Sequence, residues 1–234
     1  RLPVYLQPVT EGDNKGEYRG VANGMPNPQQ DDYKAMSAPT VQEKSTDSPL
    51  RWMMASEVAF LRAEGAMRGW TAEMGGTAEE FYNKGIELSF LENGLSADAA
   101  ARYAADETSK PTDFTDVSAA NTKYNISALG KITIKWNAGA SEEEQLERII
   151  TQKWIAMFPN GTEAWSEFRR TGYPLIFPVR SNYPTSGVDT NKQIRRMVFP
   201  QSEYSNNGAA VQEAVKLLGG PDNGGTKLWW DKKN

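Results

Sequence analysis

The sequence predicts an all-α fold in which pairs of helices are separated by long irregular loops. Apolar residues recur every three or four positions in several segments between residues 48 and 218, which is the spacing of an amphipathic helix. Capping signals precede three of these segments, and polar stretches rich in proline and glycine separate them. With 234 residues, of which 38% are hydrophobic, the chain is large enough to bury a core.

The beginning of the chain has the composition of a loop. Residues 1–49 contain six prolines and four glycines, and only the run LPVYL at residues 2–6 resembles a strand. Ordered loops of this length are usually functional or belong to a larger unit. We therefore expect a loop-rich segment over residues 1–47 and a helical region over residues 48–234.

The first predicted helix pair occupies residues 48–94. Its first helix ends near Gly69 and carries an apolar stripe formed by Leu50, Met54, Val58, Leu61 and Gly65, widened by Met53, Phe60 and Met67. Its second helix opens with Thr77 and Glu80 in capping-box spacing and stops at Asn93 and Gly94. The buried side of this second helix is formed by Phe81, Tyr82, Ile86, Leu88, Phe90 and Leu91. The short connection predicts an αα-hairpin.

A polar segment of about residues 97–140 is interpreted as an inserted loop. It contains a short helix at residues 97–105 and a strand-like patch, KITIKW, at residues 131–136. The second helix pair follows, because Ser141 and Glu144 repeat the capping-box spacing and Asn160 with Glu163 opens a shorter helix. The apolar residues of the long helix are Leu146, Ile149, Ile150, Trp154 and Met157.

The last predicted helix spans about residues 208–218, with Val211, Ala214, Val215 and Leu218 on one face. Two helix pairs that cannot bury their apolar faces alone suggest a repeat-like array.

Composition excludes several function classes. The chain has no His and no Cys, so the commonest general base, thiol nucleophiles, thiolate metal sites and disulfides are absent. Its net charge of -4 and pI of about 5.1 do not favour nucleic acid or anionic lipid as a partner. No window has the roughly 20 apolar residues of a membrane span. We expect no cofactor and no metal.

Five blocks in register resemble a known family. They are FLRAEGAMRGW at 60–70, AEEFYNKGIELSF at 78–90, ERIITQKWIAMF with EAWSEFRRTGYP between 147 and 174, RRMVFPQSEYSNN at 195–207 and GGTKLWWDKK at 224–233. In this order they resemble the C-terminal half of the SusD/RagB-like outer-membrane lipoproteins of Bacteroidetes. The opening RLPVY resembles the chain near the middle of that family, which implies a missing N-terminal half.

The resemblance implies a fold of tetratricopeptide-like helix pairs on one side and irregular loops on the other. It implies a surface-exposed lipoprotein at the cell outer membrane, anchored through an N-terminal lipid outside this chain. Its partners would be a glycan or other small nutrient and a SusC-type TonB-dependent transporter, with binding and no catalysis. In this picture Trp165 and Phe168 stack their short helix on the longer one, and residues 173–179 (YPLIFPV) pass under the loops, kept extended by proline. Trp229 and Trp230 tie down the tail.

Aromatic residues in polar loops are the candidate ligand contacts, because aromatic rings stack on the apolar face of a sugar. They are Tyr18, Tyr33, Tyr124 and Trp136. Aromatic residues on helical stripes are discounted as core, namely Phe81, Phe90, Trp154 and Trp165. A loop ring that only anchors its own loop is the alternative at each candidate position.

Other constellations give weaker hypotheses. Glu57 and Glu64 lie seven residues apart, which suits the carboxylates of a helical-repeat glycoside hydrolase or a charged helix surface. The segments DNKGE at 13–17 and PDNGG at 221–225 offer oxygen ligands for calcium but lack EF-hand spacing. A four-arginine set would clamp an acidic sugar or make salt bridges, and its members are Arg169, Arg170, Arg195 and Arg196. A scaffold that contacts only protein is the remaining alternative.

Overall fold

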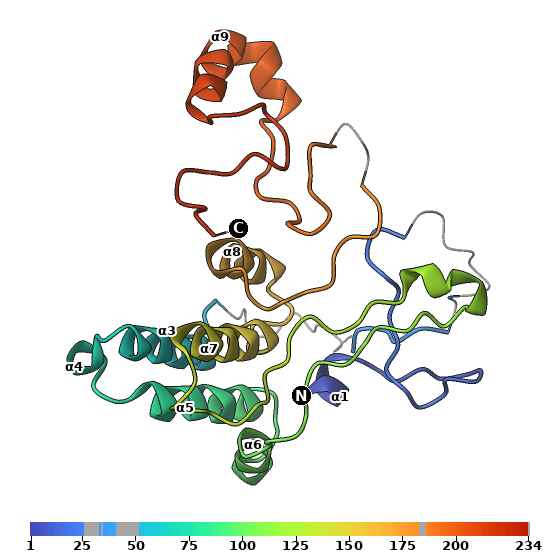
Figure 1. The fold of residues 1–234 in the computed structure, drawn as a ribbon, viewed down its shortest axis with the longest axis vertical. Coiled ribbons are helices and arrows are strands. Elements are labelled where there is room, and N and C mark those ends of the chain that lie inside the picture. Colours follow the sequence, from blue (N-terminus) through green and yellow to red (C-terminus); the bar gives the residue numbers. More distant parts are fainter. Residues whose placement is uncertain (26–32, 34, 41–51, 183–185, 234) are drawn as a thin grey trace, which may run out of the picture.

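The computed structural model describes residues 1–25, 33, 35–40, 52–182 and 186–233. Within these ranges the fold is helical and contains no strand, only two isolated β-bridges, Leu6 with Pro39 and Phe114 with Ile126. This confirms the all-α prediction. Figure 1 shows three parts, namely a stack of helices, a loop-rich side and a C-terminal arm. The predicted boundary between residues 47 and 48 lies outside the described residues.

The helix stack is built around three helices that all contact one another, α3 (Ala55–Met67), α5 (Ala78–Leu91) and α7 (Glu142–Ala156). The short helix α4 (Thr71–Met74) connects the members of the first pair, and α6 (Ala97–Ala104) packs on α5. This arrangement confirms the first predicted helix pair and the short helix expected at 97–105. None of the helices in the described part of the chain is long and apolar enough to span a bilayer.

The core lies where these helices meet. Its largest fully buried apolar side chains come from α3, α5 and α7 and are Phe60, Tyr82, Ile86, Ile149 and Ile150. Gly85 permits the close approach of α3, because a Cβ atom at this position would lie 2.6 Å from Cε1 of Phe60. The centre of the stack therefore depends on one large ring fitting against one glycine.

The predicted stripe of the first helix was partly wrong. Val58 and Leu61 are 41% and 40% exposed, whereas Ala59, Ala63 and Ala66 are buried. Small side chains allow neighbouring helices to approach closely, so packing selected the alanine face rather than the face with more branched residues. Among the other stripe residues, Phe60 and Gly65 are buried, Met53 is exposed, and Leu50 lies outside the described residues.

The predicted caps are present. At α5 both bonds of the capping box form, since the Glu80 amide donates to Thr77 Oγ1 at 3.2 Å and the Thr77 amide donates to Glu80 Oε2 at 2.7 Å. At α7 the Glu144 amide donates to Ser141 Oγ at 3.3 Å. Helix α8 (Gly161–Thr171) is capped by Asn160, whose Oδ1 accepts from the Glu163 amide at 3.3 Å. These local signals placed the helix starts within one residue.

Both strand predictions were wrong. Residues 2–6 form the single-turn helix α1 (Leu2–Tyr5), followed by a bridge residue, and a proline in the first turn is compatible with a helix start. Residues 131–136 are irregular. Side chains satisfy this backbone in place of a second strand, because Tyr82 donates to the Ile134 carbonyl at 2.6 Å and Arg148 to the Lys135 carbonyl at 3.2 Å.

The C-terminal arm carries α9 (Gln201–Leu217) at the far end of the long axis (Figure 1). The helix begins seven residues before the predicted start at 208, with a kink at Asn207, and of its residues only Val211 is buried. The tail returns to lie beside α8, where the guanidinium of Arg195 contacts Asp231, both side chains being buried. The predicted anchoring role of Trp229 was wrong, because its side chain is 83% exposed.

Helix α8 connects the stack with the arm. Trp165 donates from Nε1 to the Ile194 carbonyl at 2.8 Å, and the Arg195 guanidinium lies 5.7 Å from the ring centroid of Phe168. We expected both rings to stack on the preceding helix, and the structure places both beside the arm. Residues 173–179 then run extended toward the loop-rich side, where the ring of Phe177 lies 6.2 Å from that of Phe114.

Candidate functional site

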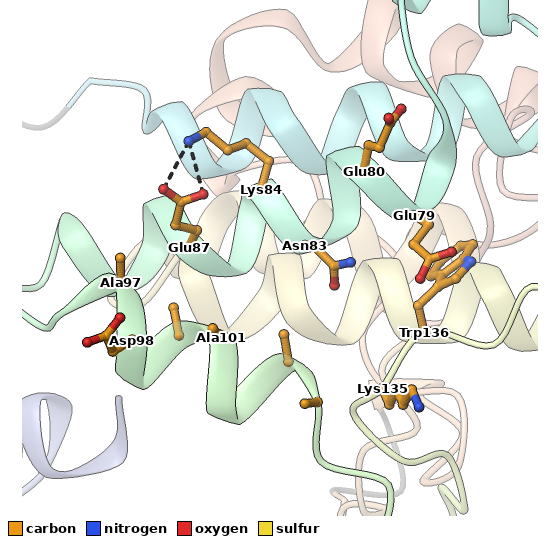
Figure 2. A pocket seen from close by; sticks show the side chains of 13 residues that line it. Glu79, Glu80, Asn83, Lys84, Glu87, Ala97, Asp98, Ala101, Lys135 and Trp136 are labelled. Atoms are coloured by element: carbon orange, nitrogen blue, oxygen red, sulfur yellow. Dashed lines mark hydrogen bonds and ion pairs between the residues drawn. The ribbon is translucent and has the colours of Figure 1, made fainter.

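Two surfaces of the described structure are candidates for ligand contact, a groove on the helix stack and the loop-rich side. The groove lies between α5 and α6 and has a volume of about 740 Å³. Its floor is formed by the small side chains of α6, and Trp136 closes one end (Figure 2). The groove exists because alanines leave the space between the two helices unfilled.

Most charges around the groove are already satisfied. Lys84 pairs with Glu87 at 3.0 Å, Glu80 accepts the hydrogen bonds of its own helix cap, and Lys135 pairs with Glu107 outside the groove. Within the described residues, Glu79 and Asp98 make no ion pair. The groove can therefore offer carboxylate acceptors above an alanine floor.

The loop-rich side is organised by a closed loop, which we define as residues 114–126. Its ends pair in a β-bridge, with the Phe114 amide donating to the Ile126 carbonyl at 2.8 Å and the reverse bond at 3.0 Å. It contains the 3-10 helix η1 (Ala119–Tyr124). Asp116 lies at its base, and the Asp116 amide donates to Asn125 Oδ1 at 2.8 Å. The loop is thereby closed by both backbone and side-chain bonds.

Tyr33 contacts the closed loop from the N-terminal segment. Its hydroxyl donates to Asp116 Oδ1 at 2.8 Å and accepts from Asn121 Nδ2 at 2.8 Å. Its side chain is half-buried, whereas Asp116 is buried. The Tyr33 hydroxyl therefore connects two segments that lie more than 80 residues apart in sequence.

Tyr124 ends η1 and is buried. Cations lie on its ring, with Lys123 Nζ at 5.1 Å and the Arg180 guanidinium at 5.8 Å from the centroid. Arg180 also donates from its amide to the Asn23 carbonyl at 2.8 Å. The N-terminal segment, the closed loop and the run after residue 173 therefore meet around Tyr124.

The four predicted aromatic residues do not form one cluster. Tyr33 and Tyr124 both contact or belong to the closed loop, and Tyr18 is a half-buried residue of the N-terminal segment. Trp136 lies in the helix stack, where its ring is 5.2 Å from that of Tyr82 and is 8% exposed. The structure thus places three candidates on the loop-rich side and one at the groove.

The carboxylate pair considered for hydrolysis belongs to a charge network between α3, α7 and α8. Glu64 pairs with Arg170 at 2.6 Å and with Arg68 at 2.8 Å. Burial raises the pKa of Glu64, but the hydrogen bonds and charges of Arg170 and Arg68 outweigh it and hold the pKa below its ordinary value. Both arginines form ion pairs with Glu64, which gives this carboxylate a structural role.

Glu57, the other member of the pair, lies near the buried amine of Lys153. Lys153 Nζ is 3.8 Å from Glu57, 3.4 Å from Glu163 and 2.8 Å from Glu167. Burial raises the pKa of Glu57, and the nearby charge of Lys153 opposes that rise. A buried amine with three carboxylates joins the three helices, which favours the interpretation of Glu57 and Glu64 as a charged helix surface.

The four arginines make intramolecular contacts. Arg170 pairs with Glu64 and Glu167, Arg195 with Asp231, and Arg196 with Asp222. Arg169 instead stacks on Trp165, with its guanidinium carbon 3.6 Å from the ring centroid, and lies 5.0 Å from the ring of Trp230. The ion pairs agree with the salt-bridge interpretation for Arg170, Arg195 and Arg196. The contact between Arg169 and Trp230 holds the tail beside α8.

Neither candidate calcium segment presents a cluster of acidic ligands. In the second segment Asp222 accepts from Tyr204 at 2.7 Å and pairs with Arg196, so its oxygens are occupied. Across the described residues, no group of three or more Asp, Glu, His or Cys side chains converges as a metal site. The structure therefore supplies no donor set at either segment.

Sequence reasoning missed Asp116 and Asn121. Both lie in a polar stretch with no periodicity, and their partner Tyr33 is 83 residues from Asp116. The only local signal was the density of Asp, Ser and Asn between residues 113 and 125, which favours turns anywhere in a chain. A contact between two irregular segments produces no periodic pattern in the sequence of either segment.

Comparison with known families decides the classification. The family model for SusD-like proteins, described as SusD and RagB outer membrane lipoprotein, matches residues 1–231. The chain belongs to the SusD-like family. This confirms the predicted resemblance, and the fold agrees, with helix pairs on one side and loops on the other.

Solved SusD-like structures superpose closely on this chain. A SusD-like protein from Bacteroides thetaiotaomicron has 43% identity and a TM-score of 0.88, covering 100% of this chain and 48% of its own length. A chitin-binding SusD homologue from Flavobacterium johnsoniae has 41% identity and a TM-score of 0.85, covering 98% of this chain and 46% of its own length. A SusD homologue from Bacteroides uniformis has 42% identity and a TM-score of 0.86, covering 99% and 46%.

The chain therefore spans about half the length of the SusD-like structures that it matches. The search among curated proteins found no match.

Proposed function

We propose that this SusD-like chain belongs to a non-catalytic protein that binds glycan at the cell surface and passes it to a SusC-type TonB-dependent transporter. The observation that carries the proposal is the 41% identity with a chitin-binding SusD homologue over 98% of this chain. Membership of a family described as outer membrane lipoproteins supports the location. A lipid anchor in the whole protein would hold the binding surface outside the cell.

The loop-rich side is the proposed ligand surface. Loops on a rigid framework commonly carry recognition, and here the loop-rich side carries the half-buried side chains of Tyr18 and Tyr33. Tyr124 and Trp136 are 9% and 8% exposed, so in this arrangement little of either side chain is open to a ligand. We therefore rank Tyr18 and Tyr33 first among the four candidate contacts.

Binding is tested by isothermal titration of the 234-residue chain with hexasaccharides derived from chitin, cellulose, starch and mannan. We expect saturable binding of at least one hexasaccharide. Absence of binding by all four would contradict the proposal for this chain. Incubation with the bound hexasaccharide, followed by assay of new reducing ends, tests the non-catalytic part, and steady release above a Glu57→Gln and Glu64→Gln control would contradict it.

The transporter partnership has its own test. The full-length protein, tagged and expressed in its source bacterium, should co-purify from detergent-solubilised outer membranes with a TonB-dependent transporter. Recovery of the tagged protein without any such transporter would contradict the delivery step and leave glycan binding untouched.

A further inference from the structure

Asp116 is a buried carboxylate that the fold of the closed loop does not fully satisfy. It is 8% exposed, and its Oδ1 atom accepts from Tyr33 at 2.8 Å and from the Ser118 amide at 2.9 Å. Its Oδ2 atom has no hydrogen-bond partner among the described residues, and none of their cations pairs with it. A buried, unpaired charge is costly, and such groups concentrate at functional sites.

A second tyrosine–aspartate contact in the structure has an arginine that neutralises the aspartate. On the C-terminal arm, Tyr204 donates to Asp222 Oδ2 at 2.7 Å, and the charge of Asp222 is offset by Arg196. Asp116 holds Tyr33 with the same type of bond, but no cation of the described residues pairs with it. The arm contact is therefore self-sufficient, whereas the loop contact retains an uncompensated charge to hold one ring.

The hydroxyl of Tyr33 is fully used inside the protein. It donates its proton to Asp116 and accepts from Asn121. A tyrosine hydroxyl has one proton to donate, so a ligand would meet the half-exposed ring of Tyr33 and not its donor. Holding the ring by bonds to two residues of the closed loop removes the entropy cost of ordering it on binding.

We propose that Asp116 is a positioning residue of the ligand surface, which fixes Tyr33 so that its ring stacks on the apolar face of a pyranose. The inference rests on the proposed glycan-binding function and deepens it. It assigns the ligand class as oligosaccharides whose pyranose rings present axial C–H groups on one face, as β-linked glucose and N-acetylglucosamine do. A ring without a free hydroxyl proton recognises that face and not a particular sugar hydroxyl.

The test is a double-mutant cycle read by isothermal titration with the hexasaccharides of N-acetylglucosamine and of β-linked glucose. Loss of the ring in Tyr33→Ala should weaken binding about tenfold, as expected for one stacking contact. Tyr33→Phe and Asp116→Ala should each weaken it about fivefold, the equivalent of one hydrogen bond. Because both break the same contact, the double variant should also lose about fivefold.

Control variants distinguish a role of Asp116 in positioning Tyr33 from a role in the stability of the fold. Asp116→Asn, whose amide oxygen still accepts from the hydroxyl, should restore at least half of the affinity that Asp116→Ala loses. Tyr204→Phe removes a matched tyrosine–aspartate bond on the arm and should leave the affinity unchanged. If Asp116→Ala does not fold, Asn121→Ala takes its place in the cycle with the same expected non-additivity.

Two results would overturn the inference alone. One is a double variant about 25-fold weaker than the unaltered chain, which would mean that the two groups act separately. The other is unchanged affinity in Tyr33→Ala while the unaltered chain binds. If neither hexasaccharide binds the unaltered chain, the assigned ligand class is wrong, and binding of the starch or mannan hexasaccharide then decides whether the proposed function survives.

Discussion

The helix stack and the loop-rich side are held together by different forces. In the stack, Phe60, Tyr82 and Ile86 are completely buried, and a charge network around Lys153 joins the helices. On the loop-rich side, distant segments meet through side-chain hydrogen bonds such as those of Tyr33 with Asp116 and Asn121. The stack therefore supplies the stability, whereas the loops can change their surface at little cost to the fold.

The largest expected effect comes from opening the apolar core of the stack. Phe60→Ala should lower the free energy of unfolding by about 4 kcal/mol, because it removes a fully buried ring packed against Gly85. The adjacent Leu61→Ala is the matched control, since Leu61 is 40% exposed, and should cost less than about 1 kcal/mol. Urea unfolding followed by circular dichroism measures both, and equal losses would contradict the assignment of the buried face.

The charge network is expected to be the second strongest element. Lys153→Met should cost about 3 kcal/mol, because it removes the buried amine that offsets the charges of Glu57, Glu163 and Glu167. The control Lys84→Met breaks an exposed pair with Glu87 and should cost about 0.3 kcal/mol. A Lys153→Met protein as stable as the Lys84→Met protein would show that the network is not needed to hold α7 and α8 together.

A pH titration sharpens this result at Glu64. The folded pKa of Glu64 lies below its ordinary value of 4.5, so its contribution is fully present above pH 4.5 and is lost as the pH falls through the folded pKa. Glu64→Gln should therefore be less stable than the unaltered chain by about 2 kcal/mol at pH 7. Unfolding curves at several pH values should show this difference shrinking in acid, and a constant difference would contradict the ionic role.

The smallest effect is expected on the loop-rich side. Asn125→Ala removes the side-chain acceptor for the Asp116 amide and should cost about 1 kcal/mol, confined to the closed loop. Hydrogen exchange should accelerate in residues 114–126 and stay unchanged in α3, α5 and α7. Faster exchange in the stack would show that the two regions are not independent.

The sequence predicted the framework well because helix signals are local. The capping box at Thr77, the cap at Ser141 and the stop at Asn93 and Gly94 each involve neighbouring residues, so they located helix ends without knowledge of the fold. The buried face of α3 was less predictable, because alanines and not large residues decided how closely the helices approach. The assignment of Trp154 to the core was also wrong, because its side chain is 40% exposed.

The candidate site was much less predictable. Tyr33 could be singled out as an aromatic residue in a polar loop, but its partners Asp116 and Asn121 are more than 80 residues away in another irregular segment. KITIKW had strand composition, yet side chains of Tyr82 and Arg148 satisfied its backbone. In both cases a contact with a residue far away in the sequence determined the local structure. Such contacts produce no periodic pattern from which they could be predicted.

Hydrogen–deuterium exchange of the chain, with and without a saturating hexasaccharide from the four-member panel, tests whether the loop-rich side binds glycan. We predict slower exchange in residues 17–25 and 114–126, with α5 and α6 unchanged. Protection confined to the α5–α6 groove, or no change with any of the four hexasaccharides, would contradict the claim that the loop-rich side binds glycan.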